Sequence, residues 1–240
     1  MTKEIRVYGL PEASLRERLA GLLEMPFVAV TLLYNEGHGT VVLTGEEAAL
    51  AAATAHVAEC LGSYVYSYEG ESLATCVVNR LATLQLTVAT AESCTGGRIA
   101  SRMTGLAGVS SVYRGGVVSY WTSVKGDVLG VPQEILDKYG PVSEQTARAM
   151  AEGACRVTGA EIAVSVTGSA GPDPDERGTP VGIVYIGLAT PTGTFCRSLD
   201  LGKRRRDRIQ DLATNHAFDV VRRYLSGLPV ETVTRRTSHP

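Results

Sequence analysis

The sequence predicts an α/β protein whose sheet has helices on both faces, preceded by a small α+β domain of the ferredoxin-like or KH-like type. Between residues 4 and 67, short apolar strands and helices follow the order β-α-β-β-α-β. From residue 72 onward, apolar runs rich in β-branched residues alternate with amphipathic segments, which is typical of a sheet covered on both faces. Gly70-Glu71-Ser72 separates the two patterns.

The first domain, residues 1–70, contains alternating apolar patterns broken by turn residues such as Asn35–Gly39. We expect four strands at Ile5–Tyr8, Phe27–Tyr34, Thr40–Leu43 and Tyr64–Tyr68, and two helices at Pro11–Leu23 and Gly45–Cys60.

The larger domain, residues 71–228, continues with longer elements. We expect strands at Leu86–Ala89, Gly116–Trp121, Ile162–Val166, Val181–Ala189 and Phe195–Leu199, and helices over 73–84, 96–104, 133–138, 144–158 and Arg206–Leu225. Ser72 and Ser143 are placed as helix caps. Residues 229–240 are polar and are expected to form a flexible tail.

The composition is that of a soluble globular protein, with 44% hydrophobic and 20% charged residues among 240. A formal net charge of −2 gives no global field that would attract nucleic acid or an acidic membrane. The five cysteines are scattered and form no C-x-x-C pair, so we expect reduced thiols rather than a zinc site or disulfide framework. We see no signal peptide and no transmembrane stretch, and we expect a cytoplasmic protein.

The first motif that could carry chemistry is AESCTGG at residues 91–97, between a buried strand and a helix. Ligands bind at the carboxyl ends of strands in open α/β sheets, and amides at a helix N-terminus stabilise an oxyanion. Ser93 and Thr95 supply hydroxyls, and Gly96 and Gly97 allow a ligand to approach the backbone. The alternative is an ordinary capped helix start.

The second motif follows an apolar strand and runs from Val118 to Lys125. A serine hydroxyl needs a base, and no histidine lies near a strand end of the larger domain. A lysine can replace histidine if burial lowers its pKa toward neutrality. Lys125 is the candidate, and Tyr120 could relay a proton or orient it. The alternative is a solvated helix lysine.

Two further features could bind the substrate. The turn TGSAGP, from Thr167 to Pro172, follows a buried strand and could hold a phosphate through backbone amides, or be a plain loop. The basic stretch Lys203–Arg206, with Arg208 beyond, opposes the dipole of the following helix. It could bind a substrate phosphate, or be a surface patch paired with Asp207.

Together and in this order, the motifs resemble the C-terminal domain of the CinA (competence/damage-inducible) family. The resemblance covers about residues 72–226 and includes AESCTGG, the tyrosine and lysine five residues apart, Leu129-Gly130-Val131, Gly140-Pro141-Val142-Ser143, the Thr-Gly-x-Ala-Gly-Pro turn and Pro180-Val181-Gly182. The first 70 residues resemble the small linking domain of full-length CinA proteins. We expect their large N-terminal domain, related to molybdopterin-binding folds, and its pyrophosphatase activity to be absent.

The resemblance implies that the protein hydrolyses the carboxamide of nicotinamide mononucleotide to nicotinic acid mononucleotide and ammonia. It implies catalysis by Ser93, Tyr120 and Lys125, with oxyanion donors around Thr95–Gly97 and no metal or cofactor. The small-molecule nucleotide is expected to contact Glu92, Thr95, Gly96, Gly97, Thr167, Gly168, Gly171, Arg204 and Arg206. Cys94 is a rival nucleophile. A homodimer or larger homo-oligomer is expected, without a specific nucleic-acid or membrane partner.

Several positions depart from the family pattern. Trp121 and Thr122 replace a small residue and an asparagine, and Ser169 replaces an apolar residue. The loop 173–179 replaces a glycine-rich one, and Gly202-Lys203-Arg204 replaces Gly-Asp-Arg. These changes leave open a second hypothesis, a catalytically silent nucleotide-binding protein. A third hypothesis, a nucleic-acid module built on the basic stretch, is disfavoured by the near-neutral charge.

Overall fold

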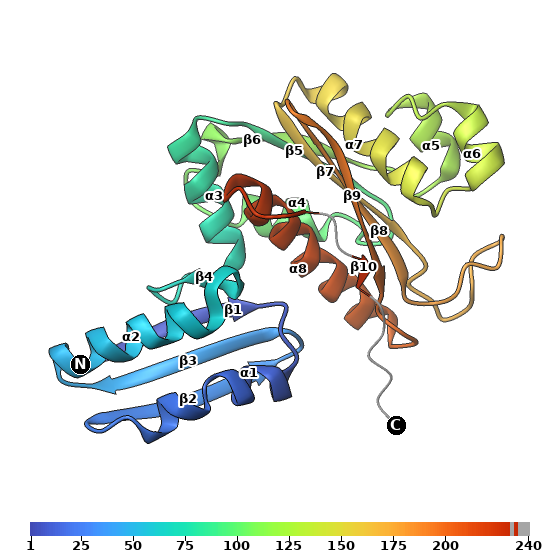
Figure 1. Cartoon of the computed structure of the whole chain (residues 1–240). Helices are drawn as coiled ribbons and strands as arrows, with labels where there is room; N and C mark the ends of the chain where they lie inside the picture. Colours follow the sequence, from blue (N-terminus) through green and yellow to red (C-terminus); the bar gives the residue numbers. More distant parts are fainter. Residues whose placement is uncertain (231–232, 235–240) are drawn as a thin grey trace. The chain divides into compact units, whose positions relative to one another are not determined.

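The computed structural model describes residues 1–230 and the backbone of Val233–Thr234, so 231–232 and 235–240 of the expected tail lie outside the described residues. The chain forms two compact units (Figure 1). The first comprises Met1–Cys76, and the second begins at Val77, inside helix α3 (Leu73–Leu84). Over the described residues, no helix is long and apolar enough to cross a membrane.

The first unit has the predicted β-α-β-β-α-β order. Its elements are β1 (Thr2–Tyr8), α1 (Glu12–Arg18), β2 (Val28–Asn35), β3 (His38–Gly45), α2 (Glu47–Leu61) and β4 (Val65–Ser67). The sheet is antiparallel with strand order β2-β3-β1-β4. The expected helix Pro11–Leu23 is wrong as one element, because α1 ends at Arg18 and a separate 3₁₀-helix covers Ala20–Glu24.

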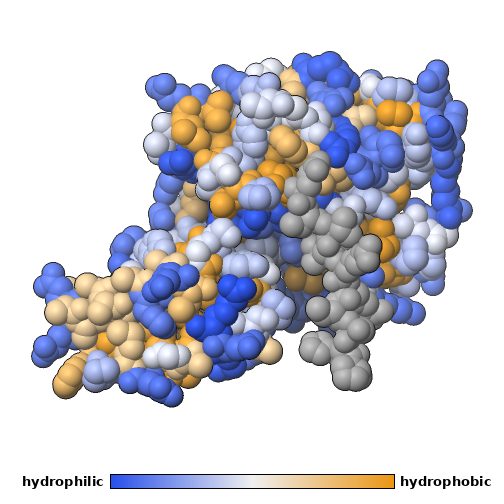
Figure 2. All heavy atoms as spheres, viewed as in Figure 1, coloured by the Kyte–Doolittle hydropathy of each residue, from blue (hydrophilic) through white to orange (hydrophobic). Residues whose placement is uncertain are grey.

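One apolar core lies between this sheet and its helices. It combines Ile5 and Val41 of the strands with Leu15 of α1 and Val57 of α2, all at most 1% exposed. The opposite side of α2 carries the exposed alanines Ala48, Ala51, Ala52 and Ala55, visible as a pale orange area in Figure 2. Alanine is compatible with both the buried and the exposed side of α2, because it has a high helix propensity and its small side chain tolerates either environment.

The second unit contains a mixed six-stranded sheet with strand order β10-β9-β8-β7-β5-β6. The strands are β5 (Val88–Glu92), β6 (Tyr113–Val118), β7 (Ile162–Gly168), β8 (Ile183–Thr190), β9 (Gly193–Asp200) and β10 (Val233–Thr234). Strands β6, β5 and β7 are parallel, whereas β8 is antiparallel to both of its neighbours. Strand β10 pairs with β9 within the stretch expected to be a flexible tail.

Helices cover both faces of this sheet, as the sequence predicts. Helix α7 (Glu144–Thr158) packs on one face, and α4 (Arg98–Thr104) and α8 (Arg206–Leu225) lie on the other (Figure 1). Met150 of α7 is fully buried against Ala89 and Ala163 of the sheet. The remaining helices are α5 (Thr122–Asp127) and α6 (Gln133–Tyr139).

A buried ion triad fixes α8 against β9. Asp219 of α8 bonds Arg197 of β9 at 2.9 Å and Arg222 one turn later at 2.7 Å, and all three side chains are nearly inaccessible. Burial alone would raise the pKa of the Asp219 carboxyl, but the two guanidinium groups outweigh it and the pKa is lowered. This ion triad therefore fixes the C-terminal half of α8 against the sheet.

Element boundaries near the carboxyl ends of the strands differ from the predictions. The strand expected at Gly116–Trp121 ends at Val118, because its partner β5 ends at Glu92 and only the amide of Ser119 still donates to the Glu92 carbonyl. The helix expected over 96–104 starts at Arg98, since Gly96 and Gly97 have positive φ angles. By contrast, α3, α7 and α8 have the predicted bounds.

We predict that Gly153→Ala destabilises the protein although alanine is the better helix former. Gly153 lies in α7, and an added Cβ would collide with the backbone carbonyl of Leu129. The free energy of unfolding in urea should fall by about 1–3 kcal/mol. Gly126→Ala in α5 is the matched control, because the nearest atom to its added Cβ is 3.8 Å away. That variant should gain about 0.5–1 kcal/mol, and an equal gain for Gly153→Ala would contradict the packing described.

Candidate active site

Ser93 and Lys125 meet where the parallel strands β5 and β6 end. Ser93 directly follows β5, and Lys125 lies in α5, six residues beyond Ser119. The Nζ atom of Lys125 donates to Oγ of Ser93 at 3.0 Å and to the carbonyl oxygen of Ser119 at 2.5 Å. The sequence predicted this pair from two motifs 32 residues apart.

Lys125 is 1% exposed, so the interpretation as a solvated helix lysine is wrong. Burial penalises the ammonium form and lowers the pKa of Lys125 from 10.5 to about 8. A pKa near 8 leaves about a tenth of the amine neutral at pH 7 and about half at pH 8. Lys125 can therefore accept a proton from Ser93 near physiological pH.

Glu92 shapes the turn that carries Ser93. Its carboxylate is fully buried and accepts hydrogen bonds from the amides of Gly97 at 3.0 Å, Ile99 at 3.1 Å and Ala100 at 2.8 Å. A carboxylate at a helix N-terminus also interacts favourably with the helix dipole. The geometry gives Glu92 the role of fixing the start of α4, which differs from the substrate contact expected of it.

The amides of the turn fall into two groups. Gly96 donates to the carbonyl of Ser93 at 3.1 Å, and Gly97 donates to Glu92, so both amides are already engaged. Within residues 1–230, the amides of Cys94 and Thr95 donate to no other residue. The donors that could hold an oxyanion are therefore at Cys94 and Thr95, one step earlier than the expected Thr95–Gly97.

Cys94 is an unfavourable nucleophile. Its side chain is 4% exposed, and burial raises the pKa of the thiol from 9.0 to about 12. At pH 8, only about one thiol in ten thousand would be ionised. The carbonyl oxygen of Cys94 accepts a hydrogen bond from Gln210 of α8 at 2.7 Å, which ties the turn to that helix.

Tyr120 faces Arg206 in the structure. Its hydroxyl accepts a hydrogen bond from Nη2 of Arg206 at 3.0 Å, while Nη1 of Arg206 donates to the carbonyl of Gly171 at 2.7 Å. The Tyr120 side chain is 58% exposed, and the described contacts do not join it to Ser93 or Lys125. Arg206 thus connects three of the motifs, but the expected relay through Tyr120 is not formed in this conformation.

The other residues expected to bind the substrate have mostly internal contacts. Thr167 is fully buried and donates to the carbonyl of Pro141 at 2.7 Å. Gly168 ends β7, where an added Cβ would meet the Ile183 carbonyl at 2.8 Å. Gly171 has a φ of +79°. Arg204 is exposed and donates to the carbonyl of Leu201 at 2.8 Å.

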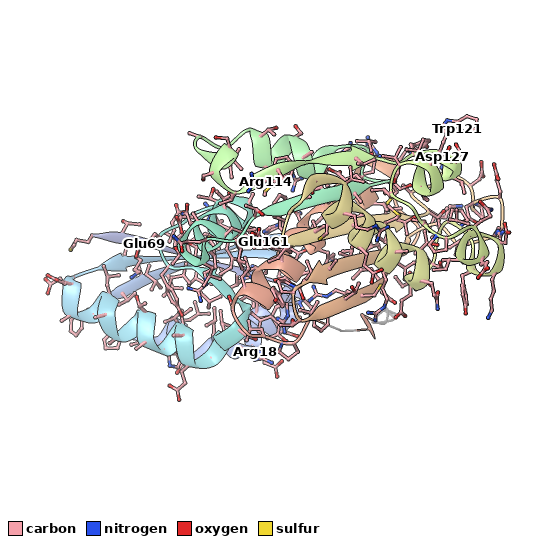
Figure 3. The ribbon with its side chains drawn as sticks, turned by 90° about the horizontal axis from the view of Figure 1, so that it is seen from above. Arg18, Glu69, Arg114, Trp121, Asp127 and Glu161 are labelled. Atoms are coloured by element: carbon pink, nitrogen blue, oxygen red, sulfur yellow. The ribbon has the colours of Figure 1, made fainter. Side chains whose placement is uncertain are left out.

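The structure also describes the positions that depart from the family pattern. Trp121 is 76% exposed and extends outward beyond the ribbon in Figure 3, and Thr122 begins α5 with its side chain exposed. Ser169 is buried next to the end of β7. The loop 173–179 is held by Arg177, which donates to the carbonyl of Asp137 at 2.9 Å.

The sequence missed two residues that support the pair. Ser119 binds Lys125 through its carbonyl, and Gln210 binds the turn next to Ser93. A contact made by the Ser119 backbone carbonyl cannot be predicted from the type of residue at that position. Gln210 looks in the sequence like an ordinary helix residue. Among the residues described, His, Cys, Asp and Glu side chains form no group of three or more that could hold a metal ion.

Comparison with known proteins gives a consistent result. The CinA C-terminal domain model matches residues 70–225. A competence-damage inducible protein of Caldanaerobacter subterraneus subsp. tengcongensis is 37% identical over 96% of this chain, and one of Acetivibrio thermocellus is 39% identical over 95%. The chain spans 57% of the length of each of these relatives.

Solved structures resemble the C-terminal part of the chain. The competence/damage inducible protein CihA from Agrobacterium tumefaciens is 38% identical, with a TM-score of 0.61 over 64% of this chain and 93% of its own. A CinA superfamily protein from Klebsiella pneumoniae is 30% identical, with a TM-score of 0.63 over 65% of this chain and 96% of its own.

The fold and the site define an α/β protein with a buried serine–lysine pair at the carboxyl edge of a mixed sheet. The family match covers more than half of the chain. The chain belongs to the CinA C-terminal domain family.

We predict that Lys125→Met stabilises the fold at neutral pH. Because the pKa of Lys125 is lowered, the unfolded chain binds more protons than the folded protein between pH 8 and 10.5, and wild-type stability rises with pH in that window. Below pH 8, burying the charged amine lowers the free energy of unfolding by its full amount, up to about 3 kcal/mol for a pKa shift of this size. Urea unfolding should show the variant about 2–3 kcal/mol more stable at pH 7, with the gap closing by pH 10.5. A less stable variant, or a gap independent of pH, would contradict the burial of an ammonium group.

Proposed function

We propose that this protein is an amidohydrolase that converts nicotinamide mononucleotide and water to nicotinic acid mononucleotide and ammonia. The observation that carries the proposal is the buried contact of 3.0 Å between the Lys125 amine and the Ser93 hydroxyl. A serine with a lysine base is an established arrangement for acyl transfer. The choice of substrate rests on family membership and on the basic residues near the site.

The first half-reaction forms an acyl-enzyme. Neutral Lys125 removes the proton of Ser93, and Oγ attacks the carboxamide carbon. The amides of Cys94 and Thr95 donate to the oxyanion that develops on the carboxamide oxygen. Lys125 then gives its proton to the departing nitrogen, the carbon–nitrogen bond breaks, and ammonia leaves.

The second half-reaction releases the acid. Lys125, neutral again, removes a proton from water, and the hydroxide attacks the ester carbon of acylated Ser93. The ester bond breaks, and Ser93 recovers its proton from Lys125. One amide and one water are consumed, and one carboxylic acid and one ammonia are produced, so the enzyme returns unchanged.

The phosphate of the nucleotide is assigned to the basic start of α8. Arg206 is exposed and lies between Tyr120 and Gly171, and Arg204 is exposed two residues earlier. An anion there also offsets the unfavourable interaction of these cations with the helix dipole. Tyr120 acts in this proposal through Arg206, at the substrate rather than at the Ser93 proton.

A silent nucleotide-binding protein is the second candidate. It is favoured by the position of Tyr120, which is turned to Arg206 and leaves the Ser93–Lys125 pair without the third expected group. Fluorescence of Trp121, the single tryptophan of the chain, should report binding because Trp121 adjoins Tyr120. A fluorescence change on adding nicotinamide mononucleotide without ammonia release would favour this candidate.

A homo-oligomer and a cytoplasmic location also remain predictions.

We predict that ammonia release from nicotinamide mononucleotide depends on Ser93 and not on Cys94. Ser93→Ala removes the nucleophile and should lower kcat by about a thousandfold or more. Cys94→Ala removes a thiol that is almost never ionised and should keep kcat within about threefold. An enzyme-coupled ammonia assay on the three proteins tests this. Loss of activity in Cys94→Ala with retention in Ser93→Ala would reverse the assignment.

We predict that kcat/KM rises with pH through a midpoint near 8 and then levels off. The proton must leave Lys125 before Ser93 can be activated, so the active fraction increases as the pH passes the pKa of about 8. Initial rates between pH 6 and 10 measure the profile, and Lys125→Ala should reduce them to background. A profile that is flat, or one that falls with rising pH, is incompatible with a lysine base.

A further inference from the structure

Two buried hydroxyls beside the Ser93–Lys125 pair have no hydrogen-bond partner. They belong to Ser119 and Thr95, both 0% exposed, and each Oγ atom is inaccessible and unpaired within the described part of the chain. An unpartnered buried hydroxyl lowers stability, and such groups are rare in folded proteins. Their presence next to a reactive pair therefore calls for a functional explanation.

Ser119 is the hydroxyl that is tied to Lys125. It follows β6, and its amide donates to the Glu92 carbonyl at 2.8 Å, which continues the pairing of Glu92 with Val118. Ser119 is therefore the neighbour of Ser93 across the two strand ends. The carbonyl oxygen of Ser119 is 2.5 Å from Nζ of Lys125. The hydroxyl of Ser119 therefore belongs to a residue whose backbone already contacts the amine.

The reaction changes what Lys125 needs. In the free enzyme, Ser93 and the Ser119 carbonyl accept two of the three hydrogen bonds that an ammonium can donate. When Ser93 attacks, its oxygen becomes bonded to the carbon of the tetrahedral intermediate and is a poorer acceptor, while Lys125, which has taken the Ser93 proton, carries a full charge in a buried site. A charged donor without an acceptor is strongly disfavoured in such a site.

We propose that Ser119 is a positioning residue for Lys125: the Ser119 hydroxyl turns to accept a hydrogen bond from the Lys125 ammonium that forms when Ser93 gives up its proton and attacks. The proposal rests on the serine–lysine chemistry described above and adds no proton transfer to it, because Ser119 only accepts a hydrogen bond. Tyr120 does not serve this purpose, since it is exposed and bonded to Arg206. The Ser119 hydroxyl, which has no partner in the free enzyme, thus gains one when Ser93 attacks.

A group of this kind leaves a distinct combination of effects. Ser119→Ala removes an unpartnered hydroxyl, so the melting temperature should stay the same or rise. The same change removes an acceptor from the charged intermediate, so acylation should slow about tenfold. The pKa of Lys125 in the free enzyme should not move, because the hydroxyl does not contact Nζ before the reaction.

The experiment follows the labelling of Ser93 by a fluorophosphonate, in which Ser93 displaces fluoride and Lys125 takes the proton. The rate is measured by mass spectrometry between pH 6 and 10 for wild type, Ser119→Ala and Ser119→Thr, with melting temperatures of each. We expect about tenfold slower labelling in Ser119→Ala at every pH, an unchanged midpoint, and near wild-type rates in Ser119→Thr. Ammonia release should follow the same order.

Ser165→Ala is the matched control. Ser165 is also a fully buried serine of the same sheet, but its hydroxyl donates to the carbonyl of Ala147. Its loss should lower the melting temperature and leave labelling near the wild-type rate.

Three results would overturn the proposal: wild-type labelling rates in Ser119→Ala, a melting temperature that falls together with the rate, or no labelling of wild-type Ser93. Normal Ser119-dependent labelling without ammonia release would leave the role of Ser119 intact and remove the proposed substrate instead.

Discussion

The burial of one lysine amine is the constraint on which the site depends. Lys125 is withdrawn from water and keeps only the Ser93 hydroxyl and the Ser119 carbonyl as described hydrogen-bond partners. Desolvation lowers the pKa of Lys125 to about 8, so that a substantial fraction of the amine is neutral near that pH and can accept a proton. In the proposed mechanism, this buried amine is the base that activates Ser93.

The rest of the unit supports that arrangement from both sides. Glu92 locks the start of α4 and with it the turn that presents Ser93, while Gln210 holds the same turn from α8. Helix α8 is in turn anchored to β9 by Asp219. Because α8 begins with Arg206, one rigid helix carries both a support for the nucleophile and the cation assigned to the substrate phosphate.

Sequence patterns predicted the elements that are determined by nearby residues in the chain. They missed features that depend on contacts with segments distant in the sequence. Helix α8 and the Ser143 cap of α7 follow from periodicity and capping, and both are confirmed. The end of β6 is fixed by the length of its partner β5, which no pattern within β6 reveals. The Ser93–Lys125 contact was expected from the motifs, but the burial of Lys125, the turn of Tyr120 toward Arg206 and the backbone contact of Ser119 are properties of the folded chain.

The most direct measurement of the central claim is a ¹³C NMR titration of the lysine Cε resonances between pH 6 and 11, with the Lys125 signal assigned by its loss in Lys125→Met. The account predicts that the Lys125 resonance titrates near pH 8, well below the ordinary lysine pKa of 10.5. A Lys125 resonance that titrates near the ordinary lysine value of 10.5 would contradict it, because an ammonium that stays charged cannot activate Ser93.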